Sequence, residues 1–223
     1  MNITSLELLS ADLQAQREFY ADILELPVKL TSSGLEVEAG RTDLLFRQAS
    51  ADFAGAYHFA FNIPENQFQA AKKWITHRVP LLRDENGKEE FESESWNSHS
   101  VYFKDAPGNV LEFIARHNLK NAVEGDFSSK QILQVSEIGL PSEDVVGFAK
   151  ELCSRLNISV FKQEPDATFT PVGDDNGLLI LPIKERIWIP NSGVPAKLLN
   201  VKVRGSASGK EWEVRGVPYE IIV

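Results

Sequence analysis

The segment from residue 57 to residue 113 constrains the fold more than any other part of this chain. It opens with residues 57–61, where apolar residues surround a histidine, and this pattern predicts a strand. A helical pattern follows, and the segment closes with two apolar runs around the turn at residues 105–109. In that turn Pro107 fixes φ and Gly108 supplies a positive φ, so the pattern predicts a hairpin.

Two polar residues stand inside these apolar strands. Glu112 lies between Leu111 and Phe113, where a carboxylate is costly unless it is paired or bound. His58 lies in the first strand of the same unit. An imidazole and a carboxylate suit Fe, Mn, Ni or Zn, so the two residues form half of a candidate metal site. The alternative is a core histidine that is satisfied by Glu112.

The same order of elements recurs before and after this unit. The chain therefore predicts an α+β fold of repeated strand, helix and hairpin modules. We expect two paired modules in residues 1–117, a linker at residues 118–130 where the periodicity is lost, and a diverged third module with C-terminal strands at residues 131–223.

Charge and cysteine content narrow the function. The net charge of −9 argues against nucleic acid or an anionic membrane as a partner. The single cysteine excludes an intrachain disulfide and fits a reducing compartment. The start of the chain lacks the basic and apolar pattern of a signal peptide, and no apolar run approaches the ~20 residues of a membrane helix. We expect a cytoplasmic protein.

The order of these residues resembles the vicinal oxygen chelate superfamily, which includes glyoxalase I, fosfomycin-resistance proteins and extradiol dioxygenases. The resemblance is carried by His58 on a first strand, an amphipathic helix from about Glu65, and the motif YF-x-D-x-x-G-N-x-x-E at residues 102–112. Residues 3–28 are similar to the opening of the same family. The resemblance implies βαβββ modules in which the last strand returns beside the first, so that His58 and Glu112 share one divalent ion. It also implies that residues 1–117 form one cup around a cleft.

The resemblance also implies ligands from the first module, and the chain departs from the family there. The corresponding positions are Ser5 and Leu45, and neither is a strong ligand. Glu7 lies two residues after Ser5 and shares its face, so it is the candidate that completes the shell. Tyr102 matches a substrate-facing tyrosine of the family and is the candidate catalytic residue. Ser100, on the same face, and Ser5 are candidates for substrate binding.

The third module lacks the ligand positions of the second. Pro171 and Leu181 stand where Tyr102 and Glu112 would be, and Ser136-Glu137 in its first strand leave the register ambiguous by one residue. We therefore predict that residues 128–223 are structural.

Two functions remain open. One is a metal-dependent enzyme acting on a small-molecule substrate, either a dioxygenase, a glyoxalase-like isomerase or a thiol transferase. The alternative is a metal-free protein that binds a small, antibiotic-like molecule in the same cup. For either function we expect a monomer or a homodimer.

Overall fold

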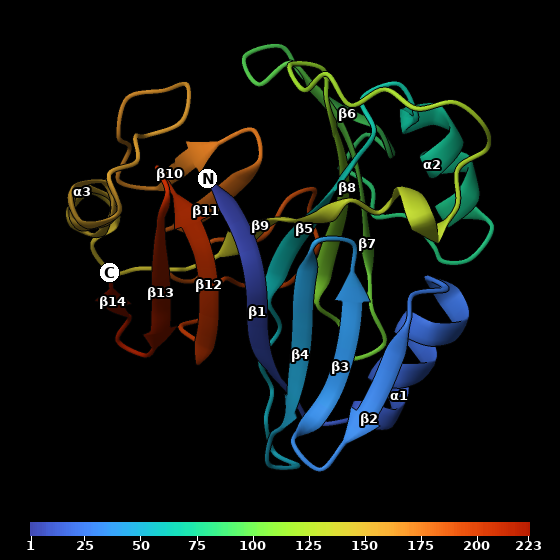
Figure 1. Ribbon diagram of the computed structural model, residues 1–223, viewed down its shortest axis with the longest axis horizontal. Helices are drawn as coiled ribbons and strands as arrows, with labels where there is room; N and C mark the ends of the chain where they lie inside the picture. The colour runs from blue at the N-terminus through green and yellow to red at the C-terminus, as the bar shows by residue number, and fades with distance from the viewer.

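Strand pairing divides the chain into two seven-stranded sheets (Figure 1). A computed structural model describes all 223 residues. The strand order is β14-β13-β12-β1-β4-β3-β2 in the first sheet and β10-β11-β9-β5-β8-β7-β6 in the second sheet.

The first sheet combines the N-terminal module with the end of the chain. Its strands are β1 (Asn2–Ser10), β2 (Val28–Thr31), β3 (Gly34–Ala39), β4 (Thr42–Gln48), β12 (Val201–Ala207), β13 (Lys210–Gly216) and β14 (Glu220–Ile222). Helix α1 (Leu13–Glu18) is capped by the Asp12 side chain and continues into the π-helix η1 (Phe19–Ile23).

The second sheet combines the second and third modules. Its strands are β5 (His58–Ile63), β6 (Phe91–Ser93), β7 (Ser98–Lys104), β8 (Val110–Arg116), β9 (Gln134–Gly139), β10 (Phe169–Asp174) and β11 (Gly177–Pro182). The helices of these modules are α2 (Phe68–Thr76) and α3 (Val145–Leu156). Helix α2 begins at Phe68 rather than at Pro64, because residues 64–67 form a turn closed by the Gln67 amide on the Pro64 carbonyl.

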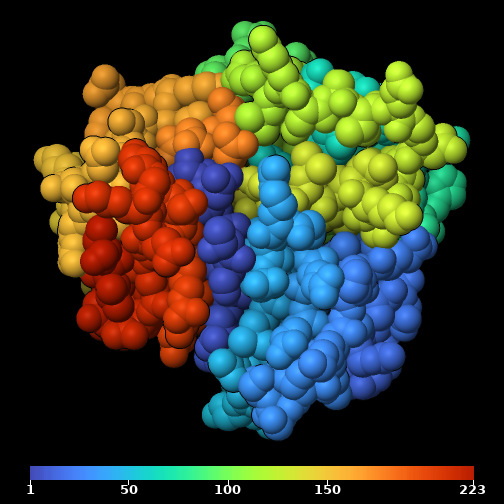
Figure 2. Space-filling model, viewed as in Figure 1, coloured from blue at the N-terminus to red at the C-terminus, as the bar shows by residue number.

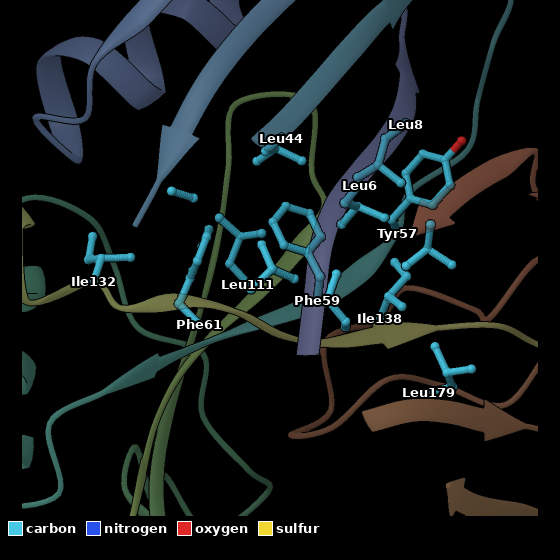
Figure 3. Close-up of a cluster of buried hydrophobic side chains, with 14 of the residues drawn as sticks. Leu6, Leu8, Leu44, Tyr57, Phe59, Phe61, Leu111, Ile132, Ile138 and Leu179 are labelled. Atoms are coloured by element: carbon cyan, nitrogen blue, oxygen red, sulfur yellow. The ribbon is translucent and has the colours of Figure 1, made fainter. Parts of the chain in front are cut away.

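The core lies between the two sheets (Figure 3). The first sheet contributes Leu6, Leu8 and Leu44, and the second sheet contributes Phe59, Phe61, Leu111 and Ile138. Burying each such side chain stabilises the fold by about 1.5–3 kcal/mol. Because side chains alternate along a strand, residues 58 and 112 face away from this core, on the opposite side of the second sheet.

The repeated βαβββ modules of the α+β prediction are confirmed, but the predicted pairing of the first two modules is wrong. Strand β1 pairs with β12 and strand β5 pairs with β9, so residues 1–117 do not form one cup. In Figure 2 the dark blue N-terminal strand lies between the red C-terminal strands and the lighter blue first module. Each of the first two modules leaves one edge of its first strand open. Strand β12 fills that edge in the first module, and strand β9 fills it in the second module.

The proposed domain limits stay a prediction. The segment at residues 118–130 contains no strand, and a short 3-10 helix, η2 (Ser129–Gln131), begins at its end. None of the helices is long and apolar enough to cross a membrane.

A fragment of residues 1–120 tests the dependence of the first two modules on the rest of the chain. It lacks β9 and β12, so the edges of β5 and β1 would be left unpaired. Unpaired, apolar strand edges promote aggregation. We expect an insoluble fragment, or one without a cooperative urea transition by circular dichroism, whereas the full chain unfolds cooperatively. A soluble fragment with a sharp transition would contradict this dependence.

Candidate metal centre

A cavity of about 350 Å³ opens on the face of the second sheet that points away from the core. Strands β5, β7, β8, β9 and β11 contribute residues to its floor. Its walls come from Trp96 and from two segments of the third module, around Gln163 and around Trp188.

Three potential metal ligands meet on this floor. His58, Glu112 and Glu137 are all buried, and each offers a ligand atom within 4.8 Å of the others. The Nε2 atom of His58 lies 3.8 Å from Oε2 of Glu112. Ala60 pairs with Glu112 on β8 and with Glu137 on β9, so the two carboxylates flank one small side chain. The pairing of two modules therefore assembles the group.

A β-bulge determines which residue of β9 enters the cavity. Phe59 pairs with Ile138 and Phe61 pairs with Val135, so Ser136 is the additional residue in β9. The bulge lets both Val135 and Ile138 reach the core while Glu137 points to the cavity. This resolves the ambiguity of one residue that the sequence left.

The His58 ring is held in one orientation. Its Nδ1 atom lies 3.0 Å from the Val110 carbonyl oxygen. A carbonyl only accepts, so Nδ1 carries the proton and Nε2 keeps a free lone pair. Burial lowers the pKa of His58 to about 4, so the ring is neutral at physiological pH. These are the orientation and protonation state that a metal-binding imidazole requires.

Trp188 packs against the histidine from the third module. The centroids of the two rings lie 4.8 Å apart. The indole is close to β9 because Gly139 has no side chain, and a Cβ at this position would lie 2.4 Å from the Trp188 ring. Gly139 therefore gives the third module room to cover His58.

The two carboxylates differ in their partners. Glu137 forms an ion pair with Arg116, which is fully buried on β8. Glu112 has no such partner. Burial and the Glu137 charge together raise the pKa of Glu112 to about 8. In the absence of a cation, Glu112 therefore holds a proton at neutral pH.

Tyr102 and Ser100 lie where the sequence placed them, on the face of β7 that lines the cavity. Tyr102 pairs directly with Glu112 across the β7–β8 hairpin. Burial, followed by the charges of Glu112 and Glu137, holds the pKa of Tyr102 well above its ordinary value. The phenol is therefore protonated at neutral pH and can donate a hydrogen bond into the cavity. The catalytic role of Tyr102 and the substrate-binding role of Ser100 stay predictions.

Glu7 and Ser5 are not part of this group, which corrects their predicted roles. Both lie on β1 in the first sheet and neither lines the cavity. Glu7 forms an ion pair with Arg47 at 3.1 Å instead. The expectation failed because it assumed that the first and second modules share a cup.

The third module supplies a candidate ligand, Glu137, which the prediction that residues 128–223 are only structural did not anticipate. Glu137 completes the candidate group, and its only sequence signal is a carboxylate that follows Ser136 and precedes Ile138 in a predicted strand. The residue of the third module that corresponds to Glu112 is Ile180 rather than the predicted Leu181, because Ile180 pairs with Gly139 as Glu112 pairs with Ala60. The sequence interpretation also did not identify Arg116 and Trp188 as residues that contact the candidate site.

Two solved structures have a fold similar to that of this chain. One is a protein from Bacillus subtilis named a "putative dioxygenase", with a TM-score of 0.55 and 15% sequence identity over 82% of this chain and 64% of that protein. The other is glyoxalase I from Zea mays, with a TM-score of 0.52 and 13% identity over 81% of this chain and 66% of that protein. The chain thus spans less than two thirds of both proteins. At these identities the likeness establishes the fold alone.

The chain matches no protein-family model, and it matches no curated protein sequence.

The buried Glu112 gives a prediction for stability against pH. The pKa of Glu112 is about 8 in the folded protein and about 4.5 in the unfolded chain. Between pH 6.5 and 8 the folded state thus holds a proton that the unfolded state has lost. We expect the free energy of unfolding of metal-stripped protein to fall with rising pH, by up to about 1.4 kcal/mol per pH unit, and to level off above pH 8.

Urea titrations at intervals from pH 6.5 to pH 9 measure this slope. The Glu112→Gln variant keeps a neutral side chain at all of these pH values, so its slope should be smaller than that of the wild type. Equal slopes in the two proteins would show that Glu112 does not titrate in this range.

Proposed function

We propose that the chain is a metal-dependent enzyme acting on a small molecule, with one divalent ion held by His58, Glu112 and Glu137. The observation that carries the proposal is the neutral His58 ring, whose free Nε2 lone pair is aimed at two buried carboxylates. One imidazole and two carboxylates suit Fe, Mn, Ni or Zn. When bound, such an ion would polarise two neighbouring oxygens of a substrate.

The donor set fits a divalent ion electrostatically. Glu112 and Glu137 bring two negative charges once both are ionised, and Arg116 offsets one of them. A cation would replace the proton of Glu112. It would also compete with Arg116 for the Glu137 carboxylate. The buried surroundings strengthen these interactions, because the local dielectric is low.

Tyr102 and Ser100 are placed to act on the substrate. The Tyr102 phenol keeps its proton at neutral pH and can donate to an oxygen that gains negative charge. Ser100 lies two residues away on the same face of β7 and can accept or donate a second hydrogen bond. A dioxygenase, a glyoxalase-like isomerase or a thiol transferase would each fit such a site. Activity assays would distinguish these three reactions.

The buried Arg116 favours a second candidate function, a metal-free protein that binds a small molecule. Arg116 neutralises Glu137, and Glu112 is neutral when it is protonated. The cavity floor is therefore uncharged overall at neutral pH without any metal. In this case Tyr102 and Ser100 would only orient the bound molecule.

Metal titration distinguishes the two functions. Protein stripped with a chelator and desalted should bind one equivalent of Zn²⁺ or Mn²⁺ by calorimetry. We expect His58→Ala to abolish tight binding and Glu137→Gln to weaken it by more than the roughly 10- to 100-fold that changes outside the ligand shell cause. His77→Ala removes an exposed histidine outside the cavity and serves as the matched control.

Binding that is equal in the wild type and in His58→Ala would contradict the proposed site. An absence of stoichiometric binding by the wild type would favour the metal-free function.

A further inference from the structure

The cavity carries a cation that the proposed metal centre does not use. Arg186 lines the cavity from the segment that follows β11. Its guanidinium lies over the Phe169 ring, 4.6 Å from the ring centroid. This stacking holds the planar group in place and leaves its edge N–H donors available.

Arg186 has no carboxylate partner of its own. No carboxylate oxygen lies within 4.0 Å of its guanidinium, whereas Glu137 in the same cavity is paired with Arg116. The charge of Asp166 acts on Arg186 from beyond this distance, and its Oδ1 atom already accepts from the Thr168 amide and hydroxyl and from the Phe169 amide. Partial burial lowers the pKa of Arg186, which shows that this cation is incompletely solvated. An unpaired, partly buried guanidinium is suited to a planar anion such as a carboxylate.

The space between Arg186 and the metal ligands has aromatic walls. Trp188 and Phe169 are joined there by Trp96 and Phe91, and all four line the cavity. Phe91 packs edge-on against Tyr102, with their centroids 5.5 Å apart, so this wall is continuous with the candidate catalytic face. Flat aromatic walls around a cavity of about 350 Å³ favour a flat, ring-shaped ligand.

We propose that the substrate is an aromatic carboxylate, with its carboxylate bound by Arg186 and its two neighbouring oxygens directed to His58, Glu112 and Glu137. Charge sets this orientation. The buried carboxylates Glu112 and Glu137 repel an anion, and Arg186 is the only arginine or lysine that lines the cavity, where Glu92 is a further, exposed carboxylate. The direction of the oxygens rests on the proposed metal-dependent function, whereas recognition of the carboxylate does not.

Two catechols that differ by one group test the carboxylate site. Metal-loaded protein is titrated by calorimetry with catechol and with 3,4-dihydroxybenzoate. We expect the wild type to prefer 3,4-dihydroxybenzoate by roughly 10- to 100-fold, as a charge-assisted hydrogen-bonded pair implies. Arg186→Gln should lose this preference while its affinity for catechol stays unchanged. Arg186→Lys keeps the charge but not the planar pair of donors, so it should retain only part of the preference.

The matched control is Arg155→Gln, which removes an exposed arginine on α3 outside the cavity. It should preserve the wild-type preference. Equal preference in the wild type and in Arg186→Gln, with circular dichroism showing both proteins folded, would overturn the proposal.

Benzoate binding to metal-stripped protein separates this proposal from the proposed function. If no metal binds but benzoate binding is lost in Arg186→Gln, the metal-dependent function fails and the carboxylate site stands. If metal binds and benzoate does not bind the wild type, the carboxylate site fails alone.

Discussion

The antiparallel pairing of β5 with β9 is the interaction on which the candidate site depends. It joins the second and third modules in one sheet and places Glu137 beside Ala60, across from Glu112. The bulge in β9 is part of the same constraint. With strict alternation, either Val135 or Ile138 would leave the core, so burial of both residues fixes the register that turns Glu137 into the cavity. Packing of the core thereby determines the chemistry on the opposite face of the sheet.

Charge balance explains why this arrangement is stable and also able to bind a cation. Two buried carboxylates would repel each other, and of the two only Glu137 forms an ion pair with Arg116. The remaining negative charge is removed either by a proton on Glu112 or by a metal ion. The His58 ring stays neutral in both cases, because burial lowers its pKa to about 4. In the proposed metal-bound state, a cation would therefore take the place of the Glu112 proton.

The sequence predicted the modules well because local patterns define them. The hairpin around Gly108, the cap at Asp12 and the isolated polar residues His58 and Glu112 are all readable over short stretches of chain. The pairing between modules was predicted wrongly, since it depends on which distant strand covers an open edge. That error placed the missing ligands in the first module, at Glu7. It also left Glu137 without a role, because Ser136 beside it made the register of this strand ambiguous.

The first sheet shows how the same backbone pattern loses the site. Glu7 lies in the place of Ala60, flanked by Leu45 on β4 and Lys202 on β12, and Ser5 lies in the place of His58. The three ligand positions are therefore serine, leucine and lysine. The exposed fraction of the side chain is 28% for Glu7 but only 4% for Glu112. An exposed carboxylate is satisfied by water and by Arg47, whereas a buried one requires a proton, a guanidinium or a metal. The third module covers the second sheet, so Glu112 is buried and is a candidate ligand, whereas Glu7 remains partly exposed.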